Sequence, residues 1–145
     1  MDEAAFRQAR DEINRLPCVF TRALLAKEAV CALAVRLAIG ERETLACRDP
    51  LARAACAELY GLLRQNSAFA LHLRDTARIL PHALTMKIEC GGLRGLQAIF
   101  DTEAPAPDVH KLVRQAIETY GELGALPFSR IVQGVAAWQL RRRRG

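Results

Sequence analysis

The stretch DVHKLVRQAIETY, residues 108–120, carries clear signals of one helix. Asp108 is a good N-cap, because its carboxylate can accept the free amide hydrogens of a first helical turn. The apolar residues that follow recur every three or four positions, which is the spacing of one buried helical face. Gly121 and Gly124 then end the pattern, since glycine readily leaves the helical conformation. We therefore predict an amphipathic helix over this stretch.

Helical spacing and capping residues recur along most of the chain. A half-buried strand would instead alternate apolar and polar residues, and we find no such alternation. The sequence therefore predicts an all-α fold class, in which residues 1–145 form a single-domain bundle of six or seven helices with a short basic C-terminal tail. The other expected helices span about residues 3–15, 21–38, 50–64, 66–80, 81–90 and 93–100, and a last one begins near Pro127.

Two of these helices carry specific expectations. The window from Phe20 to Ile39 is the most apolar in the chain, so we expect it to form the central buried helix of the bundle. Its charged residues leave it far short of the uninterrupted apolar length of a membrane span. We expect Gly91-Gly92 to end the helix over 81–90 in the left-handed conformation that glycine tolerates.

Composition indicates a globular protein, because 51% of the residues are hydrophobic and 26% are charged, which is more apolar than a disordered chain. The acidic start Met1-Asp2-Glu3 is unlike the basic region that opens a secretory signal. We therefore expect a cytoplasmic protein without membrane contact, whose cysteines are thiols rather than disulfides.

The basic residues suggest an acidic partner. The formal net charge is +5, but the run Arg141–Arg144 carries four of the 21 basic residues, and without it the charge falls to +1. Attraction to a polyanion therefore depends on the tail and on how the other charges are sorted into faces.

One such face is expected if the helices over 66–80 and 81–90 fold against each other. It would bind the backbone of RNA or single-stranded DNA without sequence readout, by neutralising phosphates and releasing counterions. The alternative is an ordinary solvated face, because Asp75 and Glu89 lie among these charges. The predicted nucleic-acid-binding residues are Arg64, Arg74, Arg78, Lys87, Arg94, Arg141, Arg142, Arg143 and Arg144.

Five cysteines offer a second interpretation. No two of them are separated by two residues, the spacing that lets neighbouring thiolates chelate one ion from a single turn. The main expectation is therefore no cofactor, with the thiols as small core residues. The alternative is a zinc or iron–sulfur site in which Cys47, Cys56 and Cys90 converge with His82.

Catalytic patterns are not found in the sequence. There is no nucleophile elbow, no paired histidine motif and no phosphate loop, since Gly91-Gly92-Leu93-Arg94-Gly95 follows a helix rather than a strand. We expect no enzyme activity and no small-molecule substrate. A third possible class is a helical adaptor that docks a partner protein through its apolar faces.

The centre of the chain resembles a known family. Leu80-Pro81, Gly92-Leu93 and Phe100 follow a pattern similar to that of the small helical subunits of type III CRISPR effector complexes. That resemblance implies a small all-α bundle and a non-catalytic subunit of an antiviral defence complex. Such a subunit stacks on other subunits along the channel that holds guide and target strands. The first two predicted helices, the cysteines and the arginine tail have no counterpart in the pattern.

Overall fold

The computed structural model describes residues 2–73, 79–100 and 104–139. These residues are mostly helical and include one two-stranded antiparallel sheet. The first part of the chain forms α1 (Glu3–Ile13), α2 (Thr21–Leu25), β1 (Ala34–Ile39) and β2 (Arg42–Cys47). The rest forms α3 (Pro50–Ser67), α4 (His82–Met86), the π-helix η1 (Lys87–Gly91), α5 (Gly92–Ile99), α6 (Val109–Tyr120), the 3₁₀-helix η2 (Leu123–Ala125) and α7 (Phe128–Ala137).

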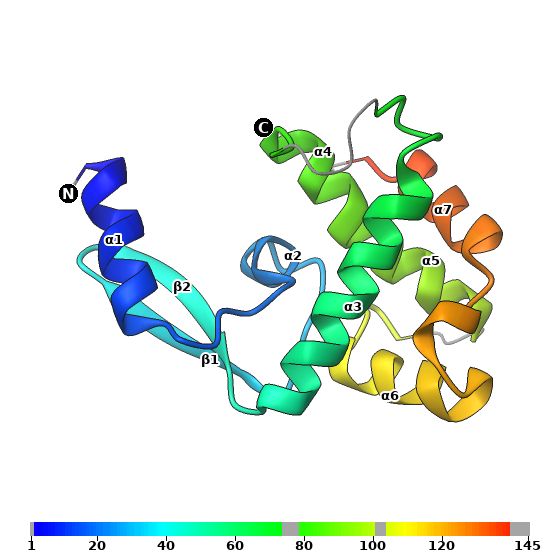
Figure 1. Cartoon of the computed structure of the whole chain (residues 1–145), viewed down its shortest axis with the longest axis horizontal. Helices are drawn as coiled ribbons and strands as arrows, with labels where there is room; N and C mark the ends of the chain where they lie inside the picture. Colours follow the sequence, from blue (N-terminus) through cyan, green and yellow to red (C-terminus); the bar gives the residue numbers. More distant parts are fainter. Residues whose placement is uncertain (1, 74–78, 101–103, 140–145) are drawn as a thin grey trace.

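Two parts are visible in Figure 1. Helix α1 and the β1–β2 hairpin project to one side as an arm, while α3 to α7 gather into a helical body, with α2 between them. The core of the body is built from apolar side chains of α3, η1, α5, α6 and α7, and Phe20 joins it from the segment before α2. The arm and the body therefore meet at the segments around α2 and at the start of α3.

Helices with a strong N-cap form where the sequence predicts them. Asp49 accepts hydrogen bonds from the amides of Leu51 and Ala52, and α3 starts at the next residue. Asp108 accepts from the amide of Lys111 and opens α6, which Gly121 ends at a φ of 85°. The helices expected over 3–15 and 93–100 and from Pro127 also form, within a few residues of the expected ends.

The predicted helix over residues 21–38 is wrong, and with it the purely all-α fold class. Helix α2 ends at Leu25, and the chain turns through Lys27 at a φ of 60°. Strands β1 and β2 then pair antiparallel from Ala34↔Cys47 to Ile39↔Arg42. A two-residue turn joins the strands, and its first residue, Gly40, has a φ of 62°, as tight hairpin turns require.

The glycine pair does not end a helix either. Helix α4 runs through η1 into α5, and Gly91 and Gly92 have ordinary helical φ values of −68° and −63°. A Cβ at Gly91 would lie 2.6 Å from Val135 Cα, and a Cβ at Gly95 would collide with the Ile131 carbonyl oxygen. We call the continuous helix formed by α4, η1 and α5 the rod. Gly91 and Gly95 are needed because the backbone of α7 packs directly against the backbone of this rod.

The expected helix over 66–80 is not found in the described residues. Helix α3 continues to Ser67, and residues 68–72 form turns in which His72 has a φ of 55°. Residues 74–78 lie outside the described part of the chain.

Candidate metal centre

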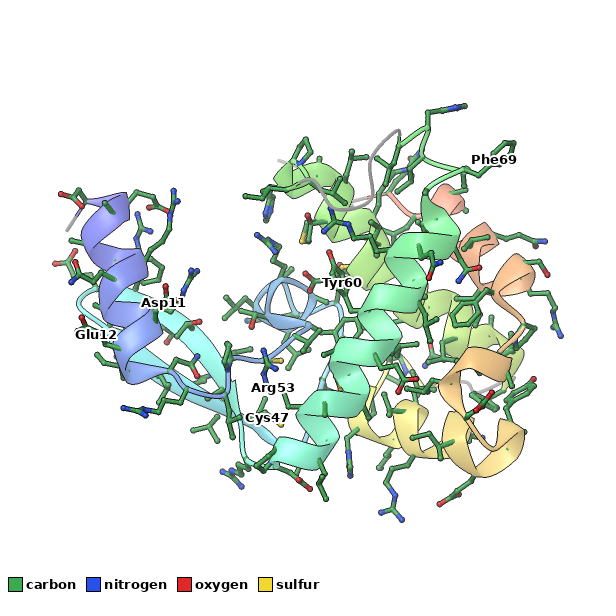
Figure 2. The ribbon with its side chains drawn as sticks, in the orientation of Figure 1. Asp11, Glu12, Cys47, Arg53, Tyr60 and Phe69 are labelled. Atoms are coloured by element: carbon green, nitrogen blue, oxygen red, sulfur yellow. The ribbon has the colours of Figure 1, made fainter. Side chains whose placement is uncertain are left out.

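Four of the five cysteines line one small cavity of about 20 Å³, at the junction between arm and body. Each comes from a different segment. Cys18 precedes α2, Cys31 lies between α2 and β1, Cys47 ends β2, and Cys56 lies in the second turn of α3. In Figure 2, Cys47 and Arg53 mark the place where the end of β2 meets α3. The fold therefore brings together thiols that are 38 positions apart at most and never close in sequence.

Backbone hydrogen bonds fix two of these segments side by side. The Cys18 amide donates to the Leu45 carbonyl at 3.0 Å, and the Cys47 amide donates to the Leu16 carbonyl at 2.8 Å. Residues 16–18 thus lie antiparallel to the end of β2. The Arg53 Nε donates to the Pro17 carbonyl at 2.7 Å, which ties α3 to the same segment.

Burial disfavours the thiolate form of two of these cysteines, Cys56 and Cys18. Burial, followed by negative charge on Cys31, Cys18 and Cys47, raises the pKa of Cys56 to about 12. Burial also raises the pKa of Cys18, although the Phe20 amide and the Thr21 hydroxyl act in the opposite direction. A cation among the four thiols reverses this balance, because coordination deprotonates thiols.

The cavity wall is otherwise apolar. Apart from Arg53, the non-cysteine residues lining it are all apolar: Val19, Phe20, Ala34, Ala46 and Val109. The guanidinium of Arg53 supplies a positive charge beside the thiols. As the side chains stand, no group of three or more His, Cys, Asp or Glu residues in the described ranges has the arrangement needed to hold a metal ion. Closing four thiols on one ion therefore requires side-chain rotation.

The predicted ligand set is half matched by this arrangement. Cys47 and Cys56 line the cavity, whereas Cys90 is buried in η1 and His82 is exposed at the start of α4. Neither of the latter lines the cavity. Burial, followed by the charges of Glu28 and Glu89, raises the pKa of Cys90 to about 12. This thiol is a core residue in the described structure.

Cys18 and Cys31 were missed because of the wrong helix. A helix over 21–38 places Cys31 in mid-helix, about 15 Å along the axis from the end near which Cys18 lies. The β1–β2 hairpin instead reverses the direction of the chain, so that Cys47 at its end lies beside Cys18. The signal that could have found the site is the turn at Gly40 between two six-residue segments, 34–39 and 42–47.

Three of the predicted nucleic-acid-binding residues lie within the described ranges, namely Arg64, Lys87 and Arg94. Arg94 Nη2 lies 3.5 Å from a carboxylate oxygen of Glu28, and Lys87 Nζ donates to the Ala136 carbonyl at 3.3 Å. Arg64 is half-buried, and its Nε and Nη2 have no hydrogen-bond partner. The nucleic-acid interpretation stays a prediction, because its remaining residues lie outside the described ranges: Arg74, Arg78, Arg141, Arg142, Arg143 and Arg144.

Within the described ranges, every helix is too short or too polar to cross a membrane. Comparison of the chain with protein-family models, curated proteins and solved structures finds no match. The resemblance to CRISPR subunits therefore stays a prediction.

Proposed function

We propose that this chain is a metal-binding protein that holds one thiophilic ion, zinc or iron, through the thiolates of Cys18, Cys31, Cys47 and Cys56. The observation that carries the proposal is the meeting of four thiols from four segments at one small cavity. A buried cysteine is an ordinary core residue. Four adjacent thiols are different, because thiolate ligands are what zinc and iron select in proteins.

The size of the cavity favours a single ion. Its volume of about 20 Å³ is close to the space of one water-sized sphere. Four thiolates complete the tetrahedral shell of Zn²⁺, with metal–sulfur distances of about 2.3 Å, once rotation about the Cα–Cβ bonds turns the sulfurs inward. The two positive charges of the ion and that of Arg53 offset three of the four negative charges of the sulfurs.

A shell of four protein ligands has no open position for a substrate or an activated water, so this site is suited to a structural or sensing role. Cys47 belongs to the arm and Cys56 to the body. An ion shared by them is a cross-link between the two parts, and its binding free energy contributes to folding.

The test is metal analysis of the full chain, purified under reducing conditions, with a matched pair of cysteine variants. We expect about one zinc or iron per chain in the wild type and in Cys90→Ser, whose thiol lies outside the cavity. Cys56→Ser should bind Zn²⁺ at least about tenfold more weakly in competition with a chromophoric chelator. Equal affinity of the two variants, or no Zn²⁺ binding by the reduced wild type, contradicts the proposal. Acid-labile sulfide would contradict the single ion.

A further inference from the structure

Glu89 is a buried carboxylate that a simple helical core does not need. It lies on the π-helix η1 and is 1% exposed. Burying a charged group costs several kcal/mol unless it is well partnered, and an apolar side chain of similar volume is often as stable or more so. π-Helical turns are rare and are often found at functional sites. The contacts of this carboxylate therefore need an explanation.

Both oxygens of Glu89 reach the first turn of α2. The Ala23 amide donates to Oε1 at 3.1 Å, and Arg22 Nη1 lies 3.7 Å from Oε2. The N-cap residue of α2, Phe20, makes no side-chain capping hydrogen bond. Glu89 thus performs the capping role from a distant segment, because it accepts an amide hydrogen that a local N-cap side chain would otherwise accept.

Helix α2 is the short element between two of the four thiols. Cys18 lies just before it, and the Thr21 hydroxyl donates to the Cys18 carbonyl at 2.6 Å. The Glu28 amide donates to the Ala23 carbonyl at 2.9 Å, which folds the chain toward Cys31 after the helix. The same residue, Ala23, therefore ties the helix to Glu89 through its amide and to the following turn through its carbonyl.

We propose that Glu89 is a positioning residue for the thiol site: by capping α2 from the π-helix, it fixes the segment that carries Cys18 and Cys31 and so sets the affinity for the metal ion. This inference rests on the proposed function. It links the helical body to the metal site through one buried side chain that does not touch the metal.

Three variants of Glu89 separate the capping contact from burial and charge. Glu89→Leu removes the acceptor, and Glu89→Asp keeps the charge but withdraws the carboxylate by one methylene. Glu89→Gln keeps an acceptor oxygen at the same distance. The control is Gln97→Leu, which replaces another buried polar side chain on the continuous rod, one that donates to the Ala104 carbonyl away from the thiols.

The measurement is the dissociation constant for Zn²⁺ in each full-length variant, by chelator competition, together with the visible spectrum of the Co²⁺ form. We expect Glu89→Leu and Glu89→Asp to bind about 10- to 100-fold more weakly with a changed Co²⁺ spectrum, as losses of outer hydrogen bonds at metal sites do. Glu89→Gln and Gln97→Leu should stay within about threefold of the wild type, since a change of that size is about 0.6 kcal/mol.

Unchanged affinity of Glu89→Asp overturns the inference, even if Glu89→Leu fails to fold. An equal loss in Gln97→Leu overturns it as well, because the effect is then one of general destabilisation. If Cys56→Ser abolishes binding while the Glu89 variants bind normally, this inference fails and the metal site stands. If the wild type binds no Zn²⁺, both fail.

Discussion

Replacing Glu89 by glutamine should stabilise the protein at pH 8 and leave its stability at pH 5 nearly unchanged. Burial raises the pKa of this carboxyl from 4.5 to about 7, and the Ala23 amide and Arg22 offset the effect only in part. The folded protein therefore binds a proton that the unfolded chain has already released. Stability from this group is complete below pH 4.5 and is lost as the pH rises through 7. Glutamine resembles the protonated side chain at every pH.

The size of the effect follows from the shift of the pKa. Each unit is worth about 1.4 kcal/mol, so a rise from 4.5 to about 7 corresponds to about 3 kcal/mol over the whole range. Most of it falls between pH 5 and pH 8. Because the side chain is 2% exposed, solvent does not screen it appreciably. Among its described neighbours, Arg22 favours the ionised form, and burial followed by the charge of Glu89 raises the pKa of Tyr60.

The assay is urea unfolding of the wild type and Glu89→Gln at both pH values. The difference between the two differences isolates this residue, because all other titrating groups cancel. We expect the variant to gain about 2 to 3 kcal/mol over the wild type between pH 5 and pH 8. Glu43→Gln is the control, since Glu43 is exposed and pairs with Arg36 on the hairpin. A gain of zero, or a loss, would refute the reasoning, because the contacts to α2 would then fully compensate for burial.

Three further outcomes test the fold and the remaining prediction. Gly95→Ala should destabilise the protein by about 2 to 3 kcal/mol in thermal unfolding, because the methyl group meets the backbone of α7, whereas Gly61→Ala, with nothing within 4 Å, should not destabilise it. Asp49→Ala should cost about 1 kcal/mol through loss of the α3 cap, and no change in the urea midpoint would contradict this. Charge reversal at Arg74 and Arg78 should weaken binding of single-stranded RNA with helicity intact, and unchanged affinity in a filter-binding titration would count against the nucleic-acid prediction.

Elements with local signals could be predicted from the sequence. The helix over 108–120 needs only its Asp108 cap, its apolar spacing and Gly121, and all three lie within one stretch. The same holds for Asp49-Pro50 at the start of α3. These signals act over a few residues, so no knowledge of the rest of the chain is needed to interpret them.

The role of Gly91-Gly92, in contrast, could not be predicted from the local sequence. Gly91-Gly92 looks like a helix stop, and the chain continues as helix through it. For Gly91 the reason lies more than 40 positions away, where the backbone of α7 packs against it, whereas Gly92 lies against the Leu63 side chain of α3. Because glycine has no side chain, it permits a tight turn and a close approach of another backbone equally well. The sequence around a glycine therefore does not distinguish the two.

The proposed thiol site could not be predicted for a related reason, which concerns the elements between its cysteines. Helix α2 separates Cys18 from Cys31, the hairpin separates Cys31 from Cys47, and the first turns of α3 separate Cys47 from Cys56. Each of the first two elements reverses the chain, so that the cysteines on either side of it come together. The number of residues between these cysteines therefore reflects the length of the element between them and not the spacing of a chelating turn. A search for closely spaced cysteine pairs therefore does not find this group of thiols. Identifying the hairpin in place of a helix brings Cys47 near Cys31, because the register Ala34↔Cys47 sets Cys47 opposite a residue three positions after Cys31.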